Sequence, residues 1–180
     1  VAEAGSIVLG NPNAAVTIIE WTDYQWPYCA KSVSLVDEVL AKYPNDVKVV
    51  IKNYPLSFHK QAKSAAQYAL AANKQGKFKD MYHKIFEDYR SLKDNPKLPE
   101  EIAVELGLDI EQLIADANSK EINNLLEQEK RELRSLENAY KTDKYQGVRL
   151  SVPKFFINGR EPSGRSIEAF SAMIEEELKK

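Results

Sequence analysis

The residues best suited to chemistry lie in the stretch Gln25-Trp26-Pro27-Tyr28-Cys29. Cys29 is the only cysteine in the 180 residues, and it falls near the start of a predicted helix, where free backbone N–H groups stabilise a thiolate. A thiolate can attack a disulfide and form a mixed disulfide with a partner. One cysteine cannot form an intramolecular disulfide, so the chain carries no dithiol that could donate one.

Cys29 and Trp26 each allow more than one interpretation. Cys29 is either a reactive thiol or a small buried hydrophobic residue with a raised pKa. The preference of free cysteine for protein interiors favours the second alternative. Trp26 has three possible roles. It is either an exposed aromatic that binds a peptide or apolar ligand, or a lid that covers Cys29, or a surface aromatic without a role. The sequence leaves these alternatives open.

Other candidate ligands and nucleophiles are few. The chain has two histidines, His59 and His83, and a single thiolate excludes zinc sites that need two or more cysteines. The histidines fall in a predicted loop and a predicted helix, without acidic or cysteine neighbours in a catalytic arrangement. This placement argues against a Cys–His hydrolase. We therefore predict neither a metal site nor a cofactor.

The elements that must position this stretch follow a strand–helix–strand order. Val16–Trp21 is β-branched and apolar, as is typical of a buried strand, and a shorter candidate strand precedes it at Ile7–Leu9. Pro27 suits the first turn of a helix, whose apolar spacing continues to about Lys42. Val47–Lys52 predicts the next strand. This order implies a parallel pair of strands with a right-handed crossover.

Helical patterns then dominate from Lys60 to about Gln146. Alanine-rich or amphipathic spacing identifies the individual helices. In chain order they are Gln61–Asn73, Phe78–Tyr89, Pro99–Leu106, Ile110–Ala117 and roughly Lys120–Tyr140. We expect residues 60–146 to form a helical insertion in one α/β domain, which consists of residues 1–59 and 147–180.

Strand character returns after the helical block. Lys154–Asn158 predicts a strand, Asn158-Gly159 a hairpin turn, and Arg160-Glu161-Pro162 the start of a return strand. A final amphipathic helix runs from Ser166, which suits an N-cap, to about Leu178.

Composition limits the partners of the chain. The 25 basic and 27 acidic residues give a net charge of −2, so no basic excess argues for binding to nucleic acid or to an anionic membrane surface. No apolar run approaches the roughly 18 residues of a membrane span, so no membrane anchor is visible. The segment that begins at Val1 shows no signal peptide, although an export segment could have preceded it.

Several motifs, in this order along the chain, resemble the DsbA-like branch of the thioredoxin superfamily. The matching segments are Gly10–Ala14, Glu20–Cys29, Lys52–Leu56 followed by His59, and Val152-Pro153 leading into Phe155–Gly159. With the helical insertion they account for nearly the whole chain. The resemblance implies a thioredoxin-like fold with a helical insertion, and an extracytoplasmic place of work such as the periplasm or cell envelope. The family's familiar task is disulfide formation or exchange in polypeptides.

The resemblance places the family's Cys-x-x-Cys turn at Trp26 to Cys29. In that turn the first cysteine is the exposed nucleophile with a depressed pKa, and the second resolves the mixed disulfide. Trp26 matches the first position and Cys29 the second. The resemblance thus implies a groove with Trp26, Pro27 and Tyr28 on its wall, from which the attacking sulfur is missing.

Residues far along the chain match other parts of the family's site. Glu20 matches a buried acid with a raised pKa that relays a proton to or from the thiol, and Lys52 matches its partner on the neighbouring strand. Apolar neighbours favour burial of Glu20 over an exposed strand position, and Asp23 is a weaker second candidate. Val152-Pro153 matches the cis-proline loop that faces the active turn, whose backbone can pair with a bound peptide.

Two functions remain after these considerations. One is a disulfide oxidoreductase with residual single-thiol exchange through Cys29. The other, which we favour, is a binding protein that has lost dithiol exchange and keeps the old groove. Its partner would be a cysteine-containing or unfolded polypeptide, or a redox partner protein.

Overall fold

Four strands form one mixed sheet in the order β1-β3-β2-β4. The computed structural model describes residues 5–180, and the strands in it are β1 (Ile7–Gly10), β2 (Val16–Thr22), β3 (Val47–Asn53) and β4 (Lys154–Ile157). The parallel pair is β2 and β3, whereas β1 and β4 run antiparallel to their neighbours. The predicted strand–helix–strand unit is therefore confirmed.

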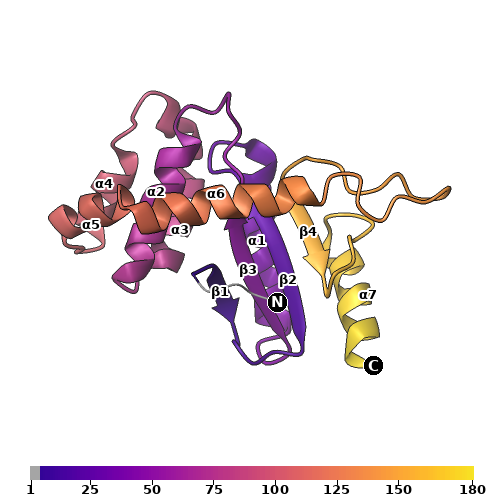
Figure 1. The fold of residues 1–180 in the computed structure, drawn as a ribbon. Helices are drawn as coiled ribbons and strands as arrows, with labels where there is room; N and C mark the ends of the chain where they lie inside the picture. The colour runs from indigo at the N-terminus through magenta and orange to yellow at the C-terminus, as the bar shows by residue number, and fades with distance from the viewer. Residues whose placement is uncertain (1–4) are drawn as a thin grey trace.

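Helices cover both faces of this sheet (Figure 1). On one face lie α1 (Pro27–Lys42) and α7 (Ile167–Leu178), and α6 (Lys120–Ser135) crosses the other face. The remaining helices form a group at one side of the sheet. They are α2 (Ala62–Lys74), α3 (Phe78–Glu87), the 3₁₀ segment η1 (Tyr89–Lys93), α4 (Leu98–Glu105) and α5 (Ile110–Ala117). The α/β fold with inserted helices is confirmed, while the division at residues 60 and 146 stays a prediction. The first four residues of the predicted α/β domain lie outside the described residues.

Two predicted elements end well before the residues that the sequence suggested. Helix α6 ends at Ser135 and not near Tyr140, because Asn138 and Tyr140 have positive φ angles of 62° and 61°. Instead of continuing the helix, the Asn138 N–H donates to the Val148 carbonyl at 2.8 Å. The return strand predicted after the Asn158-Gly159 turn reduces to a single bridge between Ile157 and Arg160.

Helix α6 is attached to the sheet by buried polar groups. The Glu129 carboxylate accepts hydrogen bonds from the backbone and side-chain N–H groups of Asn53 at 3.1 and 3.0 Å and from the Ser6 hydroxyl at 3.1 Å. The Trp21 indole N–H donates to the Glu129 carbonyl at 2.8 Å. Burial raises the pKa of Glu129 to about 7, although these hydrogen bonds act in the opposite direction.

Gly10 provides a test of the turn between β1 and β2. Its φ is +87°, and a Cβ there would lie 2.8 Å from the Val47 carbonyl oxygen and from Leu40 Cδ2. We expect Gly10→Ala to lower the free energy of unfolding by more than about 2 kcal/mol, because a collision adds to the left-handed penalty of about 1–2 kcal/mol. The matched control is Gly159→Ala, with φ +83° and open space around it. Equal losses in denaturant unfolding would contradict the collision.

Candidate functional site

Trp26 lies immediately before the first residue of α1. It is the N-cap residue, with φ −91° and ψ 122°, and Pro27 follows at the first helical position. Its carbonyl oxygen accepts hydrogen bonds from the N–H groups of Cys29 and Ala30 at 3.0 and 3.1 Å. The sequence folds this way because proline lacks the N–H that a first helical turn cannot pair. The predicted start of the helix is thereby confirmed.

The half-buried indole of Trp26 belongs to an aromatic cluster. Its ring centroid lies 5.4 Å from that of Tyr28, 5.3 Å from that of His59 and 6.5 Å from that of Phe58. Phe58 is 67% exposed and Tyr28 49% exposed. We call these four residues the aromatic cluster. Its exposed rings form an apolar surface on which a ligand can pack.

Cys29 lies on the inner side of α1 and is only 1% exposed. The backbone N–H of Asp23 points at its sulfur, with a nitrogen–sulfur distance of 3.4 Å. Burial raises the pKa of the Cys29 thiol far above its ordinary value, and the nearby Glu20 carboxyl raises it further. At neutral pH the thiol is therefore protonated as well as enclosed, which matches the second of the two interpretations drawn from the sequence.

Glu20 is buried, as its apolar neighbours indicated, but it does not pair with Lys52. Its side chain is 1% exposed, and its Oε1 atom has no hydrogen-bond partner among residues 5–180. Burial raises the pKa of Glu20 to about 8, and the charge of Arg165 lowers it in part. A buried acid with this pKa can carry a proton at neutral pH.

The predicted Glu20–Lys52 pair is wrong because of the register of the strands. Lys52 is opposite Trp21, and Glu20 is opposite Ile51. Since successive side chains of a strand point to opposite faces, Lys52 projects toward α6, where it forms an ion pair with Glu132. Its ammonium also lies 5.5 Å from the Trp21 ring centroid. Lys52 therefore connects the sheet to α6.

Asp23 has a larger part in the site than the sequence suggested. It is 1% exposed, and its carboxylate accepts hydrogen bonds from the N–H groups of Gln25 and Leu56, both at 2.7 Å. Its Oδ2 atom lies 2.9 Å from His59 Nδ1. Asp23 thus fastens the turn before α1 to the loop that follows β3. It also sets the position of the His59 ring against Trp26.

Both histidines have an acidic partner in the structure, which the sequence did not reveal. His59 contacts Asp23, and His83 Nε2 lies 2.8 Å from the Asp37 carboxylate. A signal for the first pair was available: Asp23 and His59 each follow one strand of a parallel pair, and such strands end at the same edge of a sheet. In the described part of the chain, no group of three or more His, Cys, Asp or Glu side chains could hold a metal ion.

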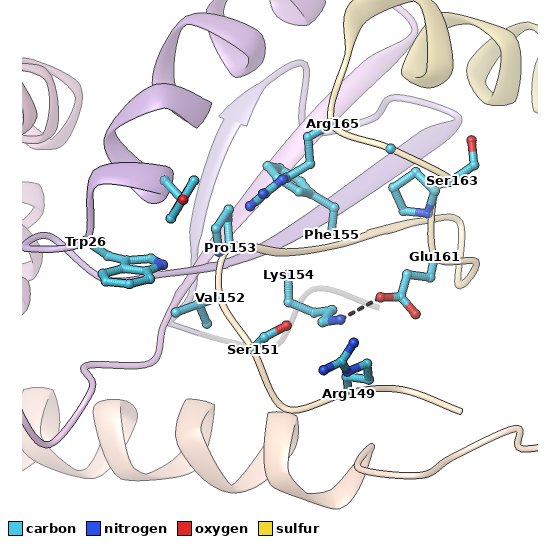
Figure 2. Close-up of a pocket in the computed structure, with 13 residues that line it drawn as sticks. Trp26, Arg149, Ser151, Val152, Pro153, Lys154, Phe155, Glu161, Ser163 and Arg165 are labelled. Atoms are coloured by element: carbon cyan, nitrogen blue, oxygen red, sulfur yellow. Dashed lines mark hydrogen bonds and ion pairs between the residues drawn. The ribbon is translucent and has the colours of Figure 1, made fainter. Parts of the chain in front are cut away.

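The loop before β4 forms the opposite wall of the site. The peptide bond between Val152 and Pro153 is cis, and both residues are buried. They lie beside a pocket of about 600 Å³, whose wall also includes Trp26 and Tyr28. We call it the cis-proline pocket; Figure 2 shows Trp26 on one side of it and Val152 and Pro153 beside it. Four of the five predicted binding residues therefore line this pocket. The fifth, Pro27, lies at the start of α1 between Trp26 and Tyr28.

Charged side chains complete the cis-proline pocket. Arg149, Lys154, Glu161 and Arg165 all line it. The Lys154 ammonium pairs with Glu161 at 2.5 Å, and the Tyr145 hydroxyl also donates to that carboxylate. In Figure 2, Arg165 and Arg149 both lie on the side of Pro153 that faces away from Trp26. The Arg165 guanidinium lies 5.7 Å from the Tyr28 ring centroid, which is close enough for a cation–π contact.

Known proteins are similar to this chain in sequence. A family model described as thioredoxin matches residues 2–176. The sequence is 30% identical over 174 residues to the "Na(+)/H(+) antiporter NhaA 1" of Salinispora arenicola, covering 93% of this chain and 24% of that protein. A protein of the same name from Mycobacterium sp. (strain KMS) is 28% identical over 162 residues, covering 87% of this chain and 24% of the relative. The chain spans about a quarter or less of the curated relatives it matches, and none of the helices described could cross a membrane.

Solved structures match nearly the whole chain. A thioredoxin-like oxidoreductase from Silicibacter pomeroyi DSS-3 has a TM-score of 0.77 and 25% identity, covering 99% of this chain and 95% of that one. Alpha-DsbA1 from Wolbachia pipientis has a TM-score of 0.76 and 18% identity, covering 98% and 92%. A periplasmic thioredoxin-like protein from Salmonella enterica has a TM-score of 0.68 and 19% identity, covering 99% and 92%.

Proposed function

Because the chain belongs to the thioredoxin family and has the fold of its DsbA-like oxidoreductases, we propose that it binds extended polypeptide beside Trp26 without turning over disulfides. The observation that carries this proposal is the pair of residues at the active turn. Trp26 occupies the N-cap of α1, where the family has its attacking sulfur, and Cys29 is 1% exposed with a raised pKa. Neither an accessible sulfur nor a thiolate is then present to attack a disulfide.

The surfaces on either side of Trp26 support polypeptide binding. The exposed rings of the aromatic cluster offer apolar contact. Val152 precedes β4, which pairs with β2 only from Lys154 onward. In this proposal the Val152 backbone pairs with an added peptide strand, which is a common way for proteins to bind extended segments. The partner we propose is an unfolded or cysteine-containing polypeptide, or the exposed segment of a redox partner protein.

The setting we propose is outside the cytoplasm, in the periplasm or cell envelope. It is supported by the name of the Salmonella neighbour, which is a periplasmic thioredoxin-like protein. The alternative function is single-thiol exchange through Cys29, with Glu20 as the proton relay. That function would require Cys29 to become exposed, because a mixed disulfide needs access to its sulfur.

Thiol labelling and peptide binding together test the proposed function. We expect a maleimide to label Cys29 only after denaturation, and the native protein to leave the reduction rate of insulin unchanged. An unfolded polypeptide whose thiols are capped with iodoacetamide should bind the native protein. Trp26→Ala should weaken that binding by about 2 kcal/mol or more, as truncation of a central aromatic typically does.

The control for this test is Tyr140→Ala, which removes a side chain that is 71% exposed and does not line the cis-proline pocket. Binding should be the same for this variant and the unmodified protein. Rapid labelling of Cys29 in the native state would favour single-thiol exchange. Absence of any polypeptide binding, or equal losses for Trp26→Ala and the control, would refute the binding function.

A further inference from the structure

Two pockets with an excess of cations lie on either side of the aromatic cluster. The cis-proline pocket contains Trp26 and Tyr28 from this cluster. A second pocket of about 500 Å³, which we call the His59 pocket, contains Phe58 and His59. Since Trp26 packs on both Phe58 and His59, a ligand that covers the cluster can extend into both pockets.

The His59 pocket is lined by cations without a compensating carboxylate. Lys60, Arg90 and Lys93 line it, and no aspartate or glutamate is found among the described residues of its wall. All three cations are exposed. The Arg90 guanidinium lies 5.5 Å from the ring centroid of Tyr89, another residue of this wall. The pocket therefore offers aromatic surface and positive charge together.

The cis-proline pocket, on the other side of the aromatic cluster, also combines aromatic surface with positive charge. Its three cations, Arg149, Lys154 and Arg165, face one carboxylate, Glu161, which already pairs with Lys154. Arg149 and Arg165 are exposed, and their guanidinium groups can bind a carboxylate through two parallel hydrogen bonds. The chain as a whole has a net charge of −2, so this positive charge is a local feature of the site.

We propose that the polypeptide bound at this site is acidic, with carboxylates on both sides of a short apolar segment. The apolar segment covers the aromatic cluster. Carboxylates on one side bind Arg149 and Arg165, and those on the other bind Arg90 and Lys93. This inference deepens the proposed function and rests on it.

The shape of the two pockets favours a peptide over other anions. Both are concave, and the aromatic cluster lies between them. Separate hollows accept individual side chains, whereas an anionic membrane presents a broad surface of headgroups. Nucleic-acid binding is generally accompanied by a basic excess, whereas this chain has a net charge of −2.

Three matched peptides test the preference for acidic chains. Each has ten residues and a fluorescent label, with a valine pair at the centre and two glutamates on each side, separated by threonine. In the second peptide glutamine replaces every glutamate, and in the third lysine does. We expect the glutamate peptide to bind at least about tenfold more tightly than the glutamine peptide. The difference should shrink between about 0.05 and 0.5 M salt, because salt screens exposed charges.

Charge-neutralising variants assign the preference to each pocket. Arg149→Gln/Arg165→Gln and Arg90→Gln/Lys93→Gln should each weaken binding of the glutamate peptide about fivefold or more and leave the glutamine peptide unaffected. The control is Lys42→Gln/Lys48→Gln, which removes two lysines distant from the site. Lys42 is at the far end of α1, whose 16 residues span roughly 24 Å. This control should change neither affinity.

The outcomes separate this inference from the function on which it rests. Equal affinity for the glutamate and glutamine peptides would overturn the acidic preference and leave polypeptide binding intact. Failure of all three peptides to bind would refute the proposed function itself. Binding to anionic phospholipid vesicles without binding to the glutamate peptide would overturn the inference in favour of a lipid surface.

Discussion

The Trp26→Cys variant is expected to form an intramolecular disulfide with Cys29 and to catalyse dithiol–disulfide exchange. The Cys29 N–H donates to the Trp26 carbonyl at 3.0 Å, and such a turn keeps the two Cα atoms within about 7 Å. Disulfides join Cα atoms that are about 4.4–6.8 Å apart. The introduced thiol would lie at the N-terminus of α1, where we expect its pKa to fall from about 8.5 to between roughly 3.5 and 7.5.

This expected result can be measured by mass and by turnover. Oxidised glutathione would accept the two electrons, and the oxidised variant should be lighter by two hydrogen atoms and have no free thiol. With a reductant present, the variant should accelerate insulin reduction. The controls are Trp26→Ser, which removes the indole without adding sulfur, and Trp26→Cys/Cys29→Ala. Failure of the single variant to close its disulfide would show that Trp26 and Cys29 do not correspond to the family's redox pair.

The Glu20→Gln variant is expected to be more stable than the unmodified protein at alkaline pH, by up to several kcal/mol. Burial raises the pKa of Glu20 from an ordinary 4.5 to about 8. The folded state therefore holds this proton more tightly than the unfolded state does. Each pKa unit is worth about 1.36 kcal/mol, so the pH-dependent penalty of the ionised acid is bounded at roughly 5 kcal/mol.

The direction of this pH dependence follows from the raised pKa of Glu20. Below about pH 4.5 the acid is protonated in both states, and the two proteins should differ little. Between pH 4.5 and 8 the unfolded state loses its proton first, so the unmodified protein loses stability relative to the variant as the pH rises. Above pH 8 the difference becomes constant.

Urea unfolding from about pH 4 to pH 9 would measure this difference. Taking the difference between the two proteins removes the contribution of Glu129, whose pKa is also raised and which titrates in both. Glu38→Gln is the control, because Glu38 is an exposed residue of α1. The free energy of unfolding of the Glu38→Gln variant should change with pH in the same way as that of the unmodified protein. A constant gap between Glu20→Gln and the unmodified protein at every pH would contradict a raised pKa.

Much of the fold could be predicted from the sequence because local patterns determine it. The strand at Val16–Thr22, the helix from Pro27 to Lys42 and the N-cap at Ser166 all lie where apolar spacing and turn residues placed them. The burial of Glu20 also followed from its apolar neighbours. In each case the deciding information lies within a few residues of the feature.

The errors concern contacts between residues that are far apart in the chain. The partner of Lys52 depends on the register of β3 and on the position of α6, neither of which a local pattern reveals. The contact of Asp23 with His59 spans two loops at one edge of the sheet. The early end of α6 depends on the Asn138–Val148 hydrogen bond, which joins the helical block to the loop before β4.

The attachment of α6 through Glu129 has a consequence for modularity. An insertion that merely covered a site could be deleted to leave a minimal thioredoxin domain. Here the deletion would strip the Trp21 indole and the Asn53 amide of their partners inside the protein, and buried polar groups without partners are strongly destabilising. The helical block therefore could not be removed without substitutions in β2 and β3 that replace these polar groups, so the sheet and the block depend on each other for stability.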